Sequence, residues 1–338
     1  MNAPMHAPMQ APLQAPMQAP MHAPMQAPLQ APMQAPMRAP LPAQITTISN
    51  WRALSAVTLD WALIAACLAA AIYFPHPLVY VLSAILIART QLALAVLMHE
   101  SAHGTLLSNR RLNDVVGQVF AAAPLMLVMY GYRSGHLQHH RAPMAVDDPV
   151  ATIFGIADYP VTRKELVWRL FKDATGIGYC LSVRAFVRGR QPEPAVRTSA
   201  ARRHGLYAII SIVALQGTLI GLLAATGHAV LYLTLWILPA MTFLPLFGRI
   251  RAITEHAGYA ASHDQRFSAR TVVRRSWQTF FVGPHRIHYH IEHHIYPRVP
   301  FYRLHQVHAL MADQGQLPLA NLYRSYGEVL RDVSRLSL

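Results

Sequence analysis

Residues 78–103 have the sequence LVYVLSAILIARTQLALAVLMHESAH, an apolar run that ends with two histidines four positions apart. The run from Leu78 to Met98 is long enough to cross a hydrocarbon core, which takes about 20 helical residues. Because residues four apart share one face of a helix, His99 and His103 can reach the same metal ion. This stretch therefore predicts a membrane-spanning helix that carries metal ligands at one end.

Three more apolar runs of similar length predict further membrane crossings. They are residues 53–74, 206–225 and 229–247. A shorter run, 115–132, contains Pro124, and we interpret it as a re-entrant or interfacial hairpin. Asp60 stands close enough to the end of its run to be expected at the membrane interface. The predicted fold class is an all-α integral membrane protein with four transmembrane helices.

The composition agrees with a membrane protein. Hydrophobic residues make up 53% of the chain and charged residues 13%, whereas a soluble domain carries about 25% charged residues. The net charge of +14 comes mainly from two segments, residues 99–204 and residues 249–338, while the short links at 75–77 and 226–228 contain no Lys or Arg. By the positive-inside rule both basic segments are cytoplasmic and form a helical cap. We expect a multi-pass protein of the bacterial inner membrane that contacts anionic lipid and binds no nucleic acid.

The N-terminal segment differs from the rest of the chain. It repeats Ala, Pro, Met and Gln, with a proline at every fourth position from Pro4 to Pro40. Proline at this density removes helix hydrogen bonds and disfavours a sheet. We therefore predict a disordered tail over residues 1–49, which is not a signal peptide, and one membrane domain over residues 50–338. His6 and His22 belong to the repeat and are not predicted as ligands.

Two further histidine boxes accompany His99 and His103. Residues 136–140 read HLQHH and residues 290–294 read HIEHH, both with histidines at i, i+3 and i+4, which we expect to converge on one side of a helix. A single histidine, His256, follows the last crossing and returns to the same predicted membrane face. The predicted metal ligands are His99, His103, His136, His139, His140, His256, His290, His293 and His294. No catalytic residue beyond these ligands and no site for an organic cofactor is predicted.

The number of histidines limits the kind of metal site. The pattern of His99, Glu100 and His103 alone also matches zinc metalloproteases, but one tetrahedral zinc needs far fewer imidazoles than three boxes provide. Imidazole-rich sites suit Fe, Zn, Cu or Ni, and eight box histidines fit two metals of higher coordination number. A metal transporter would need ligands near the membrane midplane, whereas the boxes lie at helix ends or in polar stretches. Cys67 and Cys180 are too few for an iron–sulfur cluster.

The remaining polar residues near the boxes have expected supporting roles. Ligating imidazoles usually donate their second ring N–H to a carboxylate or a carbonyl. The carboxylates near the boxes are Glu100, Glu255, Glu292, Asp147 and Asp148. We interpret the other histidines of the domain as structural. These are His76, His204, His228, His263, His285, His288, His305 and His308.

The three boxes together resemble those of the integral-membrane fatty acid desaturase and hydroxylase superfamily. The third box, with Tyr296 and Pro297 directly after it, is similar to the corresponding region of acyl desaturases. His256, with Glu255 before it and Gly258 after it, resembles an extra histidine motif of alkane hydroxylases and many bacterial desaturases. The resemblance covers residues 51–310. It implies a mushroom-shaped helical protein with a cytosolic cap, two irons bound by the box histidines, O2 as oxidant and a supply of electrons.

The resemblance also implies an O2-dependent oxidoreductase of the fatty acid desaturase type. We expect it to desaturate an acyl chain of a fatty acid or lipid. Two alternatives remain open: a hydroxylase on the same scaffold, and a desaturase of a specialised small metabolite or a carrier-bound intermediate. The sequence contains neither a cytochrome b5 haem motif nor a dinucleotide fingerprint. Electrons are therefore expected from a separate donor of the ferredoxin, rubredoxin or cytochrome b5 type.

Overall fold

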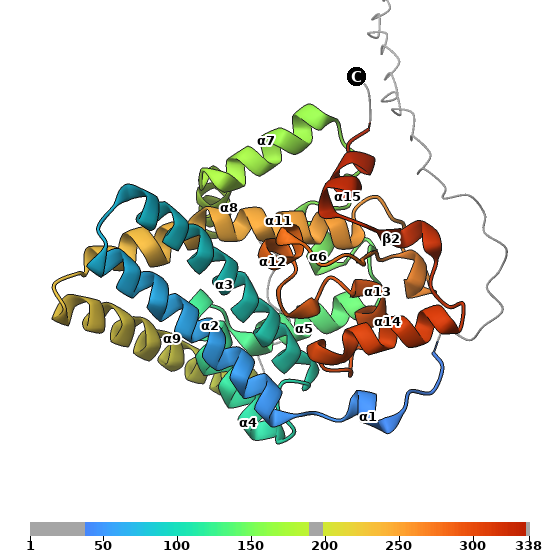
Figure 1. Ribbon diagram of the computed structural model, residues 1–338, viewed down its shortest axis with the longest axis horizontal. Coiled ribbons are helices and arrows are strands. Elements are labelled where there is room, and N and C mark those ends of the chain that lie inside the picture. Colours follow the sequence, from blue (N-terminus) through green and yellow to red (C-terminus); the bar gives the residue numbers. More distant parts are fainter. Residues whose placement is uncertain (1–37, 189–198, 336–338) are drawn as a thin grey trace, which may run out of the picture.

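The computed structural model describes residues 38–188 and 199–335 and is almost entirely helical (Figure 1). The predicted disorder of residues 1–37 lies outside the described residues. Of the rest of that tail, α1 (Ala43–Thr46) forms one helical turn. Leu41 and Ile45 pack against the apolar cluster around α13 (His290–Ile295), and the hydroxyl of Tyr296 donates to the carbonyl of Ala39 at 2.9 Å.

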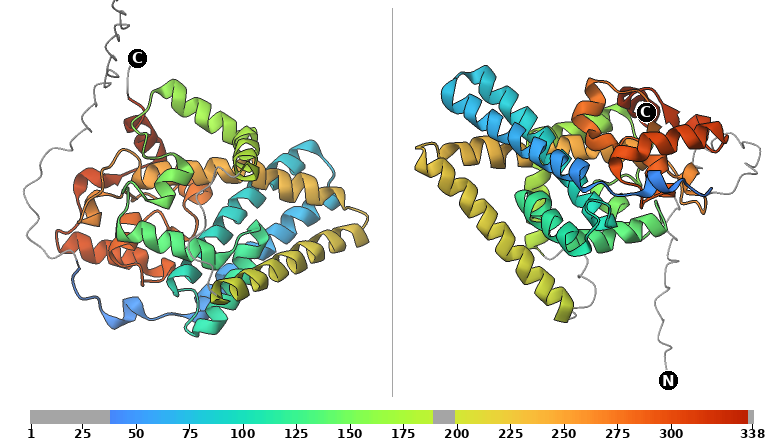
Figure 2. Two further views of the ribbon diagram at one scale, coloured as in Figure 1. Left: turned by 180° about the vertical axis from the view of Figure 1, so that it is seen from behind. Right: turned by 60° about the horizontal axis from the view of Figure 1, so that its bottom comes forward.

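Four helices are long and apolar enough to cross a membrane, as predicted. The first two form a hairpin of α2 (Asn50–Tyr73) and α3 (Pro77–His103), and the third lies in α9 (Ser199–Ala225). The fourth span, Tyr232–His256, joins η3 (Tyr232–Ile237), α10 (Leu238–Met241) and α11 (Phe243–His256). In the right-hand view of Figure 2, α9 runs away from the α2–α3 hairpin.

Local chemistry sets the ends of α3. Pro77 stands at its first position, where no N–H is needed, and His76 accepts a hydrogen bond from the N–H of Leu78 at 3.2 Å. Gly104 ends the helix in the left-handed conformation, with φ of 75°, just after His103. The helix is therefore terminated directly beyond the first histidine box.

The α2–α3 hairpin packs through small and branched apolar side chains but also contains buried charge. Asp60, expected at the membrane interface, is buried inside the protein at 5% exposure. Its carboxylate accepts from Arg89 of α3 at 3.5 Å and contacts Nε2 of His285 at 2.7 Å. Two distant partners, one cationic and one polar, thus compensate the burial of this carboxylate. Its expected depth near the membrane interface stays a prediction.

The weak apolar run around Pro124 is bent, as a re-entrant hairpin requires. It consists of α4 (Arg110–Val116), η1 (Gly117–Ala122), η2 (Ala123–Leu125) and α5 (Met129–Arg141), and its two arms meet at 94°. The bend leaves the carbonyl of Pro124 without a backbone donor among the described residues, whereas the carbonyl of Ala123 accepts from the N–H of Met126 at 3.1 Å. Both accept from the side-chain amide of Gln216 of α9, at 2.9 and 3.1 Å. The broken backbone is thus satisfied by a neighbouring helix.

Most of the remaining elements gather at the end of the molecule away from the α2–α3 and α9–η3 links (Figure 1). The remaining elements are α6 (Pro149–Phe154), α7 (Arg163–Ala174), α8 (Ile177–Val187), η4 (Gln265–Phe267), β1 (Thr271–Val272), α12 (Trp277–Val282), η5 (Pro284–Arg286), α13, η6 (Phe301–Arg303), α14 (Leu304–Asp313), η7 (Leu319–Asn321), β2 (Leu322–Tyr323) and α15 (Tyr326–Asp332). β1 and β2 pair in parallel. Which side of the membrane this part faces stays a prediction.

Candidate metal centre

The nine predicted ligands come together in two sets, and within each set the nearest ring nitrogens lie within 4.8 Å of one another. The five-histidine cluster contains His99, His103, His136, His140 and His293. The four-histidine cluster contains His139, His256, His290 and His294. The sets adjoin, because the rings of His140 and His294 stack with centroids 4.3 Å apart.

Each HxxHH box divides its histidines between the two clusters. In α5, His136 and His140 enter the five-histidine cluster while His139 enters the other one. In α13, His290 and His294 enter the four-histidine cluster while His293 crosses to the first. The expectation that all three converge on one side was wrong. At 3.6 residues per turn, positions i and i+4 are about 40° apart, whereas i+3 and i+4 are about 100° apart.

The Nε2 atoms form more short contacts than hydrogen bonding among the rings can explain, because those of His136, His140 and His256 each lie close to two others. In the five-histidine cluster they are 2.9 to 3.0 Å apart for the pairs His103–His136, His136–His140 and His140–His293. In the other cluster His256 Nε2 lies 3.2 Å from His139 and 2.8 Å from His290. A neutral imidazole has only one N–H. The lone pairs of several imidazole nitrogens therefore point to one place in each cluster, which is the arrangement that binds a metal cation.

Unpartnered buried nitrogens support the same conclusion. Neither ring nitrogen of His99 has a hydrogen bond, although the ring is fully buried and its Nδ1 lies 3.4 Å from Glu100 Oε1. That separation is within ion-pair range, but the two groups are not aligned for a hydrogen bond. A buried ring without partners is costly, and a metal ion at the centre of the five-histidine cluster would satisfy it.

Two rings of the four-histidine cluster are fixed from behind. His139 Nδ1 lies 2.9 and 3.0 Å from the two carboxylate oxygens of Asp148, and His256 Nδ1 donates to the carbonyl of Ser268 at 2.7 Å. These contacts place the proton on Nδ1 and leave each Nε2 as a free lone pair, the form that binds a metal. The sequence indicated Asp148 but gave no signal for the Ser268 carbonyl.

The other nearby carboxylates bind elsewhere. Asp147 is exposed and accepts from Gln138 at 3.2 Å. Glu292 lies 2.5 Å from His308 Nδ1 and accepts from the hydroxyl of Thr271 at 2.6 Å. Glu255 accepts from Arg251 at 2.6 Å and is 3.4 Å from His290 Nδ1. Of the five, only Asp148 forms a short contact with a clustered ring.

Burial also controls protonation. Burial, and then the neighbouring histidines, lower the pKa of His290, His293 and His294 well below the ordinary value. These rings are therefore neutral at pH 7, as metal ligands must be. Burial works to raise the pKa of Asp148, but the hydrogen bonds from His139 and two backbone N–H groups outweigh it and hold that pKa below its usual range.

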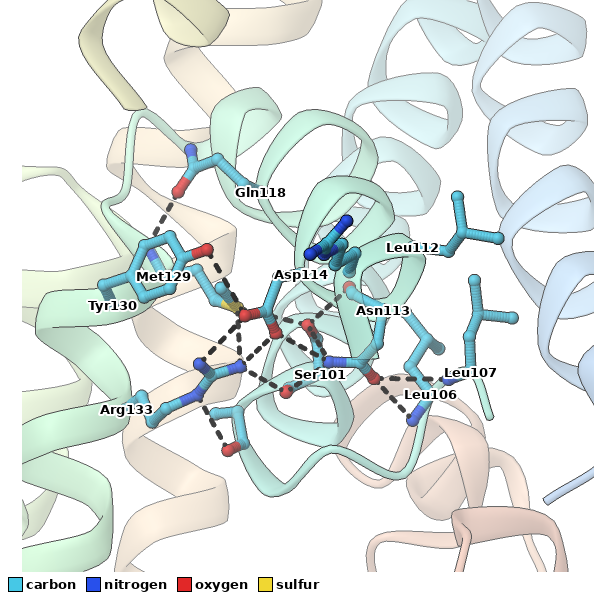
Figure 3. A network of polar contacts seen from close by, with 12 residues as sticks. Ser101, Leu106, Leu107, Leu112, Asn113, Asp114, Gln118, Met129, Tyr130 and Arg133 are labelled. Carbon is cyan, nitrogen blue, oxygen red and sulfur yellow. Dashed lines mark hydrogen bonds and ion pairs between the residues drawn. The ribbon is translucent and has the colours of Figure 1, made fainter. Parts of the chain in front are cut away.

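A buried polar network positions the first two boxes relative to each other (Figure 3). The guanidinium of Arg133, on α5, donates to Asp114 of α4 at 2.5 Å and to the carbonyl of Ser101 of α3 at 2.9 Å. Asn113 donates to the same carbonyl at 2.9 Å and accepts from the N–H groups of Leu106 and Leu107. The network thus joins the end of α3, which carries His99 and His103, to α5.

The histidines interpreted as structural lie outside both clusters among the described residues. His288 donates to the carbonyl of Val272 at 2.8 Å, and His308 and His285 contact carboxylates, as described above. His204 stacks on Tyr130 with ring centroids 3.8 Å apart. These histidines therefore pack against other side chains or form hydrogen bonds and ion pairs.

A comparison with known families decides what kind of protein carries this centre. A family model described as fatty acid desaturase matches residues 75–326, which is more than half of the 338 residues. The chain belongs to the fatty acid desaturase family. Membership confirms the resemblance seen in the boxes and makes the protein a member of an oxidoreductase family of membrane enzymes. The paired histidine clusters fit the metal cofactor of such a desaturase.

Three curated relatives carry desaturase names. The dihydrorhizobitoxine desaturase of Bradyrhizobium elkanii is 27% identical over 277 residues, which cover 78% of this chain and 76% of that protein. The sn-2 acyl-lipid omega-3 desaturase (ferredoxin), chloroplastic, of Helianthus annuus is 23% identical over 81% of this chain. The omega-3 fatty acid desaturase, chloroplastic, of Sesamum indicum is 22% identical over the same share. The matches span 63% of each of the two plant desaturases.

Proposed function

We propose that this desaturase-family member is a membrane-bound, O2-dependent di-iron enzyme that introduces a double bond into an acyl chain of a fatty acid or lipid. The observation that carries the proposal is the division of nine histidines into two adjoining clusters, each with four or more converging nitrogens. Imidazole suits iron. The five-histidine cluster would hold one ion and the four-histidine cluster the other, so that all nine predicted histidines are ligands.

Iron in these clusters supplies the O2-dependent oxidation of an unactivated C–H bond. The chain itself holds the ions and excludes water. His99, His256, His293 and His294 are fully buried, so the centre is shielded from bulk solvent. Tyr132 lies flat against His136, with centroids 5.2 Å apart, and limits the freedom of that ring.

An apolar groove of about 370 Å³ is a suitable place for the acyl chain. It lies among α3, α11, α12 and α15 and is lined mainly by aromatic and aliphatic side chains, among them Phe247, Ile250, Phe281 and Leu330. Ile250 precedes Arg251, which pairs with Glu255, the neighbour of His256. The groove therefore approaches the four-histidine cluster.

The proposed orientation puts both clusters on the cytoplasmic side of a bacterial inner membrane, from the charge distribution along the chain. A separate redox protein would then deliver electrons from the cytoplasm. The name of the sunflower relative includes ferredoxin, which favours a ferredoxin over the rubredoxin and cytochrome b5 types.

A second candidate substrate class follows from the bacterial relative. Its name, dihydrorhizobitoxine desaturase, refers to a specialised metabolite rather than a lipid. The same centre would then desaturate a small or carrier-bound intermediate. Hydroxylation on the same scaffold would be distinguished by its product, an alcohol in place of an alkene.

Two measurements test the proposal. The purified protein is expected to contain about two irons per chain, and a single zinc would contradict it. Expression in a host of defined lipid composition is expected to produce new unsaturated lipids, detected by mass spectrometry against a host that carries the His293→Ala variant. New hydroxylated lipids would favour the hydroxylase. Unchanged lipids with full iron content would favour the small-metabolite substrate.

A further inference from the structure

A second cavity, separate from the apolar groove, lies on the other face of α12. It has a volume of about 610 Å³ and is bordered by α3, α12, η5 and η6. We call it the arginine pocket, after Arg89, Arg275 and Arg286, which line it together with His285 and His288. No Asp or Glu of the described residues lines this cavity.

The three arginines are not equivalent. Arg89 is neutralised: it pairs with Asp60 at 3.5 Å, and its Nε donates to the carbonyl of Phe280 at 3.0 Å. Arg275 and Arg286 form no hydrogen bond or ion pair through their side chains within residues 38–188 and 199–335. The pocket therefore carries two positive charges that no acidic side chain compensates.

Of Arg275 and Arg286, Arg286 lies in the more constrained environment. It is half-buried, and burial, followed by the positive charges of Arg275 and Arg52, lowers its pKa. His285 and Arg286 also have positive φ angles, 53° and 61°. Two successive side-chain-bearing residues in the left-handed region are strained. The contact of His285 with Asp60 helps to hold this backbone, which places an uncompensated guanidinium at the pocket.

The pocket adjoins both the metal centre and the surface. Phe301, which lines it, donates its backbone N–H to Glu100 at 3.0 Å, and Glu100 follows His99 of the five-histidine cluster. On the outer side, Trp277 and Phe280 of α12 are exposed at 73% and 44%, as expected for a helix at a membrane surface. The apolar groove lies on the opposite face of α12, and the two cavities share no lining residue.

We propose that the arginine pocket binds the anionic head of the substrate, a carboxylate or a phosphate, whose apolar chain occupies the groove across α12. Arg275 and Arg286 supply the charge, and guanidinium groups suit the paired oxygens of either head. A concave site of this volume fits a small charged group better than the flat surface of a protein partner. This inference rests on the proposed function only in identifying the bound amphiphile as the substrate.

Direct binding tests the inference without turnover. The intact protein in neutral detergent is titrated calorimetrically with laurate, dodecyl phosphate, dodecanol and inorganic phosphate. We expect an anionic amphiphile to bind at least about tenfold more tightly than dodecanol, the difference expected for a charge-assisted contact. Preference for laurate identifies a carboxylate head and preference for dodecyl phosphate a phosphate head.

The matched variants are Arg275→Gln with Arg286→Gln, and Arg274→Gln as control, because Arg274 is exposed and does not line the pocket. The double variant is expected to lose the anion preference while keeping its iron content and dodecanol affinity, and the control to keep all three. An unchanged preference in the double variant overturns the inference. So does inorganic phosphate binding as tightly as dodecyl phosphate. Iron content and product analysis report separately on the proposed function.

Discussion

The two histidine clusters differ in how they hold their rings. The five-histidine cluster has one donor more, but His103 and His140 are only half-buried, and His99 has no hydrogen bond to orient it. The four-histidine cluster is fully buried, and two of its rings are fixed by Asp148 and by the carbonyl of Ser268. The five-histidine cluster thus has one ligand more than the other, with its rings placed by helix geometry. The four-histidine cluster has no additional ligand, but two of its rings are held by hydrogen bonds.

This difference indicates that a cluster can bind its metal either with an additional ligand or with ligands whose rings are oriented by hydrogen bonds. A helix end such as that of α3 fixes two rings at i and i+4 without help. His256 has no such neighbour on its own helix, so a backbone carbonyl sets its tautomer and direction. The clusters should therefore respond differently to the loss of a ring and to the loss of an anchor.

The largest difference is expected when one ligand is removed from each cluster. His256→Ala leaves three imidazoles, and we expect iron to fall to about one ion per chain with loss of desaturation. His103→Ala leaves four imidazoles, and we expect both ions to remain after purification. Iron is measured by elemental analysis of the detergent-purified variants. Equal iron loss in the two variants would show that the fifth histidine is not a spare ligand.

The next largest effect is expected from a change at Asp148, which contacts Nδ1 of His139. Asp148→Asn keeps one oxygen that can accept from the N–H of Val150, which caps α6, but removes the negative charge behind the ring. Loss of such a partner typically costs 10 to 100-fold in metal affinity. We expect that loss at the four-histidine cluster only, measured by competition with a chelator.

Asp147→Asn is the control for that variant, because Asp147 is exposed and contacts Gln138 rather than a clustered ring. It should bind both ions as the unmodified protein does. If Asp147→Asn and Asp148→Asn lose iron equally, the anchoring role of Asp148 is excluded.

A packing change should act on the five-histidine cluster instead. A Cβ atom at Gly117 would stand 2.0 Å from the hydroxyl of Ser101, which lies between His99 and His103. Gly117→Ala therefore forces α3 and η1 apart, at a cost of about 1 to 3 kcal/mol. We expect a lower melting temperature in detergent and weaker iron binding by the five-histidine cluster. Gly131→Ala is the control, since nothing lies within 4 Å of its added Cβ, and it should melt no lower than the parent because Ala favours a helix over Gly.

The smallest effect is expected from Tyr130→Phe. It removes the hydroxyl that donates to Asp114 at 3.3 Å but keeps the ring that stacks on His204. Because Arg133 still holds Asp114, the loss of stability should stay below about 1 kcal/mol. Thermal unfolding measures it. A loss of iron in this variant would show that the network of Figure 3 is less redundant than its contacts suggest.

Sequence reasoning succeeded where chemistry and local spacing act together. The apolar runs predicted four spans, and the eight box histidines with His256 are the nine that the fold gathers into two clusters. The sequence prediction missed the division of each HxxHH box between the two clusters, although the angle between successive residues of a helix is enough to predict it. The helix of the last span continues past Phe247 to His256, and Arg249 pairs with Asp173 and Arg251 with Glu255 inside the protein.

Other features could not be read from the sequence because their partners are distant. Asp60 meets Arg89 and His285, which stand 29 and 225 positions away. No local pattern announces that pairing. The carbonyl of Ser268 is a backbone group. Every residue has a backbone carbonyl, so the residue type does not indicate which one accepts from His256. Tertiary geometry alone assigns these contacts.

The contact of Gln216 with the bend at Pro124 has a consequence for biosynthesis. The carbonyl of Pro124 leaves the ribosome 92 residues before the amide that satisfies it. Until α9 has been synthesised, the bent segment has unsatisfied polar backbone and should stay at the aqueous surface of the membrane. The third histidine box is translated later still. Metal loading is therefore expected to be among the last steps in the maturation of this protein, after every span has been inserted.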